Sequence, residues 1–148
     1  MTPLKLIVAN PGHFHAALAL RETHPLLHDE VFVYAENGPD LERFLALVKN
    51  FNARTANPTA WKLHVHRGAD YLERLIIERR GDMVLLAGRN DSKMRQIHQL
   101  QAAGFPVLGD KTWLIDENDL PTLRAVVASE PLCLDMMTER WDIGNRLL

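Results

Sequence analysis

The chain has 148 residues, a formal net charge of −2 and a single cysteine, Cys133. That length suits one domain with an ordinary core, and the near-neutral charge gives no reason to expect a nucleic acid or an anionic membrane as a partner. The lack of an apolar leader and of a bilayer-length apolar run predicts a soluble, cytoplasmic protein whose lone cysteine is a small buried side chain.

The first segment predicts a strand, a turn and a helix. Residues 6–9 are an apolar run that suits a strand buried on both faces. Asn10, Pro11 and Gly12 break this run, and residues 13–20 are predicted to be a helix. A dinucleotide-binding fold begins in this way, because the N–H groups at a helix N-terminus can bind a pyrophosphate. The usual fingerprint has three glycines and only Gly12 is present, so this segment taken alone is more typical of plain structure.

Strands and helices then alternate to the end of the chain. Further strands are predicted at residues 30–35, 61–66, 83–87, 106–109 and 132–136. The helices between them are predicted at residues 39–51 and around the apolar stripes Leu72–Leu75–Ile76, Met94–Ile97–Leu100 and Leu120–Leu123–Val127. This alternation indicates an α/β fold of the Rossmann type, a doubly wound parallel sheet of about six strands with helices on both faces. Residues 139–148 predict a last helix without a terminating glycine or proline, which suggests either a piece of a longer chain or a chain with a partner that receives this helix.

Four segments are expected to meet at one edge of this sheet, namely residues 10–14, 36–37, 88–91 and 110–113. Ligands of open parallel sheets bind beyond the carboxyl ends of the strands, where the strand order reverses. Glu36 follows the second strand, where a carboxylate can accept hydrogen bonds from a ribose diol. It would also repel a 2′-phosphate, which favours NAD over NADP as the cofactor. The alternative is a solvated turn glutamate.

Lys111 is the candidate catalytic residue. It follows a buried strand and lies between Asp110 and the large Trp113. An ammonium group there can donate a proton or a hydrogen bond to a developing alkoxide, and a nearby positive nicotinamide would lower the pKa of the lysine. The alternative is a solvent-facing lysine in a polar turn, which is the commoner environment of a lysine.

Two pairs of histidines stand two residues apart, His13 with His15 and His64 with His66. Zinc sites usually need three or four ligands, and no cysteine or acidic partner stands at a familiar spacing, so we predict no metal site. We interpret His64 and His66 as the polar face of an edge strand. His13 is expected to contact the cofactor or to cap the turn locally.

Three motifs resemble a known family, and the similarity extends over nearly the whole chain. They are residues 11–18 (PGHFHAAL), 103–113 (AGFPVLGDKTW) and 135–140 (DMMTER). They resemble the N-terminal, nucleotide-binding domain of the glucose–fructose oxidoreductase and inositol dehydrogenase family (Gfo/Idh/MocA), and within it a subgroup of candidate oxidoreductases. The fifth strand of that family ends in a Glu-Lys-Pro-type motif whose lysine assists hydride transfer, and Lys111 stands at the matching position.

Three positions depart from the family pattern. The glycine-rich turn is reduced to Gly12, the proline of the lysine motif is replaced by Thr112, and the loop after the fourth strand keeps only Asn90 of a Thr-Pro-Asn-type pattern. The lysine position is therefore matched more closely than the pyrophosphate contact.

The resemblance implies an NAD-dependent oxidoreductase that acts on a sugar, a polyol or a related alcohol. The implied positions are Gly12, His13 and Phe14 at the pyrophosphate, Glu36 at the adenosine ribose, Gly88, Arg89 and Asn90 along the nicotinamide half, Asp110 as a further cofactor contact and Lys111 as the catalytic residue. Family members also have a C-terminal domain that supplies most substrate contacts and the interface of a homo-oligomer. Residues 1–148 are expected to be the nucleotide-binding domain without that second domain, and so to be inactive by themselves.

The alternative hypothesis is a non-catalytic module that senses nucleotides or binds another protein. The missing glycines favour it, because a domain that retains the fold can lose the fingerprint. Both hypotheses predict the same fold for these residues, so they are distinguished by turnover and by whether a strand-rich substrate domain follows residue 148.

Overall fold

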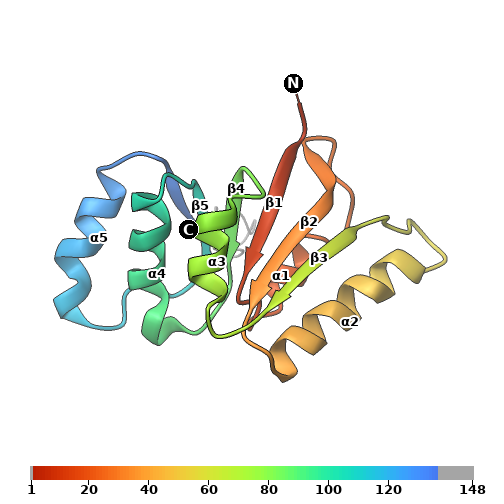
Figure 1. Cartoon of the computed structure of the whole chain (residues 1–148), viewed down its shortest axis with the longest axis horizontal. Helices are drawn as coiled ribbons and strands as arrows, with labels where there is room; N and C mark the ends of the chain where they lie inside the picture. The colour runs from red at the N-terminus through yellow and green to blue at the C-terminus, as the bar shows by residue number, and fades with distance from the viewer. Residues whose placement is uncertain (1, 137–148) are drawn as a thin grey trace, which may run out of the picture.

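The computed structural model of the chain describes residues 2–136, which form a single six-stranded sheet flanked by helices (Figure 1). All pairs of neighbouring strands are parallel, and the strand order is β3-β2-β1-β4-β5-β6. The strands are β1 (Leu4–Ala9), β2 (Leu27–Ala35), β3 (Lys62–Arg67), β4 (Met83–Leu86), β5 (Val107–Asp110) and β6 (Cys133–Met136). The doubly wound Rossmann-type sheet predicted from the alternating pattern is confirmed.

Helices cover both faces of the sheet. They are α1 (His15–Leu18), α2 (Pro39–Ala53), α3 (Tyr71–Glu78), α4 (Asn90–Ala102) and α5 (Leu120–Val127), the last preceded by a short 3₁₀ turn at Glu117–Asp119. The helices α1 and α2 lie on one face, and α3, α4 and α5 lie on the other (Figure 1). The two sets are on opposite faces because the crossovers of a parallel sheet are right-handed, so the chain changes face when the strand order reverses.

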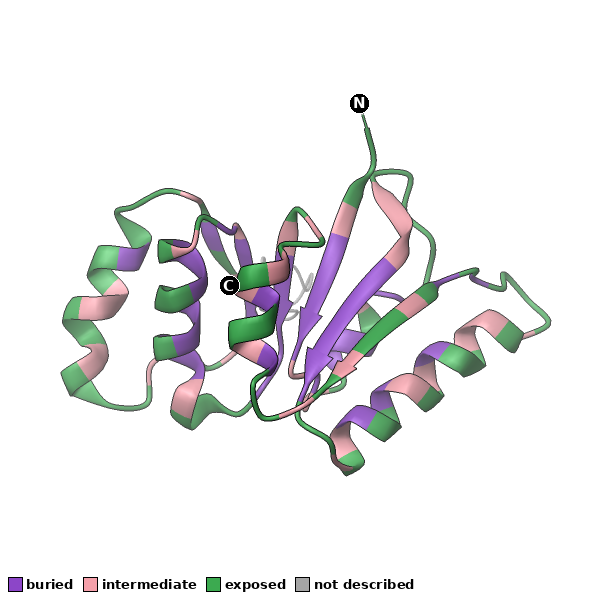
Figure 2. Ribbon diagram, viewed as in Figure 1, coloured by how far each residue is buried: buried purple, intermediate pink, exposed green. Residues whose placement is uncertain are grey.

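The sheet buries apolar side chains on both of its faces (Figure 2). Successive residues of a strand point to opposite faces, so Ile7 packs under α3 and α4 whereas Leu6 and Val8 pack under α1 and α2. The central strands β1 and β4 are nearly inaccessible to solvent from Leu6 and Val84 onwards. This is the reason that both read as continuous apolar runs rather than alternating ones.

Some predicted boundaries are wrong. The first helix extends over only four residues, His15–Leu18, rather than residues 13–20. His13 lies before this helix, and its N–H donates to the carbonyl of Ala87, which follows β4 (3.0 Å). The strand β2 begins at Leu27, earlier than residue 30, and β5 begins at Val107 and includes Asp110 instead of ending before it. The predicted helix at residues 139–148 lies outside the described residues.

Between residues 2 and 136, no helix has the combination of length and hydropathy needed to cross a bilayer. Cys133 is buried as predicted, and its burial raises the pKa of the thiol.

Candidate functional site

The strand order reverses between β1 and β4, so a crevice is expected at the carboxyl ends of these two strands. The turn that follows β1 is held from both sides. Asn10 donates its N–H to the carbonyl of Tyr34 at the end of β2 (2.9 Å), and His13 donates to the carbonyl of Ala87 after β4 (3.0 Å). Asn10 has a φ of 46°, a left-handed conformation that asparagine tolerates better than most residues. Asn10 thus adopts, at this turn, a backbone conformation for which the usual fingerprint has glycine.

Gly12 is not needed for close packing at this turn. A Cβ added to it would come no closer than 3.5 Å to any of its neighbours, which is an ordinary contact. Its N–H donates to the carbonyl of Asn10 (2.7 Å) and that of His13 is also used within the fold. The backbone donors that the family resemblance assigned to a pyrophosphate are therefore partly engaged, and Phe14 and His15 supply the next N–H groups along the chain.

A cavity of about 470 Å³ lies beside Glu36. Its lining includes Asn10, Gly12 and Glu36 from the ends of β1 and β2, together with Tyr71 and Gln96. The Tyr71 hydroxyl accepts hydrogen bonds from Gln96 Nε2 (2.8 Å) and Asn10 Nδ2 (3.5 Å). Burial raises the pKa of Tyr71, and the nearby charge of Glu36 raises it further. Asp40, Asp91 and Arg89 also line this cavity, so it combines hydroxyl and amide groups with three carboxylates and one guanidinium.

A second cavity, of about 450 Å³, adjoins the first and contains most of the remaining predicted residues. The two cavities share the lining residues Gly12, Asp40 and Arg89. The rest of the second lining consists of His13, Gly88, Asn90, Asp110, Lys111 and Thr112. Glu36 and Lys111 therefore lie in adjoining cavities along one crevice at the carboxyl edge of the sheet. Phe14 is 55% exposed and lines a smaller cavity, of about 170 Å³, that also contacts Gly12 and His13.

Asp110 joins the start of the chain to the end of β5. Its side chain is buried, with Oδ1 2.7 Å from His15 Nδ1 and Oδ2 2.9 Å from His13 Nδ1. Oδ1 also accepts a hydrogen bond from the N–H of Lys111 (2.8 Å). The two predicted residues His13 and Asp110 thus contact one another. Asp110 is also the acidic partner of His15, which the sequence spacing did not reveal because the two residues are 95 positions apart.

Lys93 is a functional candidate that the sequence analysis missed. It lies in the first turn of α4 and is only 1% exposed. Its Nζ donates hydrogen bonds to Asn90 Oδ1 (2.7 Å) and to the carbonyl of Lys111 (3.1 Å). Burial lowers the pKa of Lys93, and the charge of Asp110 partly opposes this effect. Its spacing from Ile97 and Leu100 places it on the buried stripe of that helix, which is the signal that identifies it in the sequence.

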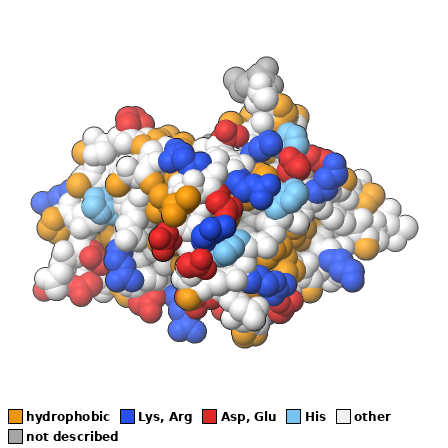
Figure 3. Space-filling view, viewed as in Figure 1, with side chains coloured by type: hydrophobic (Ala, Val, Ile, Leu, Met, Phe, Trp, Pro, Cys, Tyr) orange, Lys and Arg blue, Asp and Glu red, His pale blue; other side chains and the backbone are white. Residues whose placement is uncertain are grey.

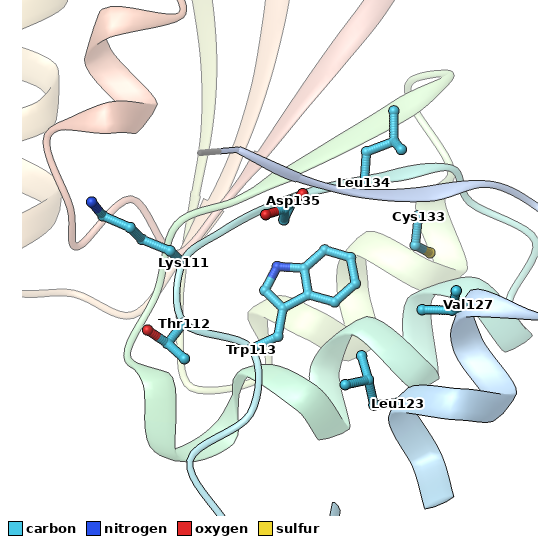
Figure 4. A pocket seen from close by; sticks show the side chains of 8 residues that line it. All are labelled: Lys111, Thr112, Trp113, Leu123, Val127, Cys133, Leu134 and Asp135. Carbon is cyan, nitrogen blue, oxygen red and sulfur yellow. The ribbon is translucent and has the colours of Figure 1, made fainter. Parts of the chain in front are cut away.

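An apolar pocket of about 450 Å³ lies on the other side of Lys111 (Figure 4). Its apolar lining consists of Trp113, Leu123, Val127, Cys133 and Leu134, and Lys111, Thr112 and Asp135 also line it. The indole N–H of Trp113 donates to the carbonyl of Gly109 (3.1 Å), which fixes the ring against β5. Figure 4 shows the Lys111 side chain extending away from Trp113 and the apolar walls. The strand end thus separates a polar crevice from an apolar pocket.

His64 and His66 lie on the edge strand β3, as expected from their alternation. His64 Nε2 is 3.3 Å from Glu30 and His66 Nε2 is 3.0 Å from Asp70. Histidine side chains are mixed with charges of both signs on the surface shown in Figure 3. Each of these two histidines therefore contacts a different carboxylate.

Solved structures of two oxidoreductases are among those similar to this chain. A candidate oxidoreductase from Parabacteroides merdae matches 99% of this chain at 38% sequence identity with a TM-score of 0.92, and the match covers 35% of that protein. Myo-inositol 2-dehydrogenase from Lactobacillus plantarum matches 99% of this chain at 15% identity with a TM-score of 0.68, and the match covers 40% of it. The chain thus spans between a third and a half of the length of each. Neither a family model nor a curated protein matches the chain.

The second likeness shows a shared fold, and the first adds substantial sequence identity over the same residues. Both agree with the resemblance that the lysine motif and the first turn indicated. The fold and the motifs of this chain fit the N-terminal domain of the glucose–fructose oxidoreductase and inositol dehydrogenase family.

Proposed function

We propose that this chain is the NAD-binding domain of an oxidoreductase that acts on a sugar, a polyol or a related alcohol. The observation that supports this proposal is the crevice at the strand-order reversal, in which adjoining cavities contain Glu36 at one end and Lys111 at the other. A dinucleotide has two ends with different chemistry, and a crevice with a carboxylate and an ammonium at its two ends suits it. Both solved relatives are longer than this chain. The proposed substrate is therefore that of a longer protein that contains this domain.

In this proposal Glu36 accepts hydrogen bonds from the adenosine ribose. A negative charge at this position disfavours a 2′-phosphate and so favours NAD over NADP. Arg67, at the end of β3, is the cation that contacts the adjoining Asn37 (3.1 Å), and it is ion-paired with Glu42. Because Glu42 balances its charge, Arg67 does not cancel the preference that Glu36 creates.

At the other end of the crevice, Lys111 is the group that assists hydride transfer. NAD supplies the hydride acceptor when it is bound, and the protein orients the reacting alcohol and its proton. The Lys111 ammonium donates a hydrogen bond to the oxygen on which charge develops. The backbone that carries Lys111 is fixed by Asp110 and Lys93, which hold its N–H and its carbonyl. This restraint limits the positions that the ammonium can reach.

Calorimetric titration of the purified chain with NAD and with NADP tests the proposal. We expect saturable binding of NAD and weaker binding of NADP. The variant K111A is expected to retain NAD affinity, because the lysine lies at the chemical end of the crevice rather than at the ribose. If neither nucleotide binds, the proposal is wrong.

A non-catalytic nucleotide-sensing module is the second candidate. The engaged N–H groups of Gly12 and His13 favour it, since a strong pyrophosphate site would leave these donors available. Turnover separates the two candidates. In the protein that contains this domain, NADH formation from a panel of polyols and sugars that is lost in K111A supports the enzyme. NAD binding with no turnover on the same panel supports the sensor.

A further inference from the structure

His13, His15 and Asp110 gather at the start of α1 and the end of β5. Each offers one nitrogen or oxygen atom, and these atoms all lie within 4.8 Å of one another. The side chains of His15 and Asp110 are only 4% and 2% exposed, whereas that of His13 is 42% exposed. Both His13 and Asp110 line the second cavity. The cluster is therefore buried at His15 and Asp110, and its His13 side faces a cavity.

Hydrogen bonds within the described part of the chain do not satisfy this cluster. Asp110 Oδ1 is engaged by His15 and by the N–H of Lys111. Oδ2 lies 2.9 Å from His13 Nδ1, yet that buried nitrogen has no hydrogen-bond partner among residues 2–136 because the angles are unsuitable. An imidazole nitrogen and a carboxylate oxygen thus face one another without a bond between them. Buried polar atoms of this kind are rare, and an ion between them is one of the few explanations.

We propose that His13, His15 and Asp110 bind a divalent first-row transition metal ion such as Zn²⁺. Two imidazoles and one carboxylate form a donor set that such ions prefer, and a site with three protein ligands keeps a coordination position open. Neutral imidazole can bind a metal through Nδ1, the atom that each histidine presents to Asp110. The identity of the ligands follows from the fold, because no spacing within the sequence joins residue 110 to residues 13 and 15.

Only small movements are needed to admit the ion. Tetrahedral ligands about 2.1 Å from a zinc ion lie about 3.4 Å from one another. If Asp110 binds the ion through Oδ2, the distance of 2.9 Å from that oxygen to His13 Nδ1 must lengthen by about 0.5 Å, which rotation of the His13 side chain can provide. His15 Nδ1, which lies 2.7 Å from the other oxygen, Oδ1, must give up that contact to bind the ion. Lys111 holds Asp110 through its N–H, so the carboxylate is oriented before the ion arrives.

Charge near the site sets limits on the affinity. The buried Lys93 acts on Asp110 electrostatically and repels a second cation. A site with one carboxylate and a neighbouring ammonium is expected to bind more weakly than one with two carboxylates. The open position faces the cavity that His13 and Lys111 line, so a water molecule or an anionic oxygen ligand can complete the coordination there.

Metal titration of the chelator-treated 148-residue chain tests the proposal directly. We expect about one equivalent of Zn²⁺ to bind by calorimetry, and Co²⁺ to give the visible absorption of a four- or five-coordinate ion. The variant H13Q is expected to weaken binding at least about tenfold, because loss of a residue that merely supports a ligand already costs that much. His13 is partly exposed, so this variant is expected to fold, and D110N serves as the second variant if it unfolds at a similar temperature.

The double variant H64Q/H66Q is the matched control, since it removes as many histidines from a surface strand. It should bind the metal as the unchanged chain does. Failure of Zn²⁺ and Co²⁺ to bind, or binding that H13Q leaves unaltered, would overturn the proposal. The metal site does not depend on the nucleotide, so titration with NAD on the same samples distinguishes its failure from failure of the proposed function.

Discussion

The Lys93 Nζ lies 3.1 Å from the carbonyl oxygen of Lys111, so a buried lysine holds the backbone of an accessible one. The same ammonium donates to Asn90 Oδ1 at the start of α4 (2.7 Å). Lys93 thereby joins the segment after β4 to the segment after β5, which form two of the walls of the second cavity.

We expect K93M to destabilise the fold by about 2 kcal/mol, because it removes hydrogen bonds from a buried charged group while keeping the length of the side chain. Urea unfolding followed by circular dichroism measures the loss. K49M is the control, since Lys49 is an exposed lysine in the middle of α2. Equal stabilities of the two variants would show that Lys93 does not restrain the segment that carries Lys111.

The charge of Glu36 sets the expected preference between the two nucleotides. E36Q keeps the shape of the side chain and removes the repulsion toward a 2′-phosphate, so the ratio of NAD to NADP affinity should fall about tenfold. E22Q is the control, because Glu22 is exposed in the loop that leads into the opposite end of β2. Calorimetry with both nucleotides gives the ratio, and an unchanged ratio in E36Q would remove Glu36 from the ribose site.

The hydrogen bond from the Tyr34 hydroxyl to Glu78 (2.7 Å) predicts a pH dependence on the acid side. This bond, with a smaller effect of Arg74, lowers the pKa of Glu78 below its ordinary value of 4.5. A lowered carboxyl pKa gives stability that is present above about pH 4.5 and is lost as the pH falls through the folded-state pKa. The variant Y34F should therefore be less stable than the unchanged chain above about pH 4.5, with the difference shrinking in acid.

The same pair predicts a second dependence on the alkaline side. Burial and the bond to Glu78 raise the pKa of Tyr34 above its ordinary value of 10.0. Above that pH the unfolded chain loses the tyrosine proton while the folded chain keeps it, so stability falls as the pH rises. Y34F should lack this contribution. Thermal unfolding of both proteins across the pH range measures the two slopes, and parallel curves at both ends would contradict the prediction.

Gly104, which follows α4, has a φ of +84°, a conformation that a side chain disfavours. A Cβ there would contact only Arg79, at 3.6 Å, so the cost of G104A is confined to the backbone and is expected to be about 1 kcal/mol. G38A is the control, because Gly38 has an extended backbone and its added Cβ would meet nothing within 4 Å. Urea unfolding should give a change within about 0.5 kcal/mol for the control.

Much of the fold could be predicted because burial leaves a direct pattern in the sequence. The strand β4 is apolar throughout and lies inside the sheet, whereas β3 alternates with polar residues and lies at the edge. Residues 27–29, at the start of β2, were missed because His28 and Asp29 are polar and resemble a loop. The pairing of β1 with β2 shifts register between Leu4 and Leu6, alongside this polar stretch.

The contents of the site were harder to predict, since they depend on contacts between distant segments. Glu36, Lys111 and the segment 88–90 could be placed at one edge of the sheet from the alternation of strands and helices alone. The contact of Asp110 with His13 and His15 could not, because nothing in the spacing of residues 95 positions apart specifies which carboxylate an imidazole will reach. Nothing in the sequence singles out Tyr71 or Gln96, although both line the first cavity and are joined by a hydrogen bond.

The turn after β1 is bonded on one side to Tyr34 and on the other to Ala87, which enter the fold at different stages of synthesis. A growing chain that has completed only β1, β2 and β3 possesses half of the crevice and lacks the wall that follows β4. Any ligand that spans both cavities therefore binds only molecules in which β4 has already paired with β1. Its binding energy stabilises that folded state alone.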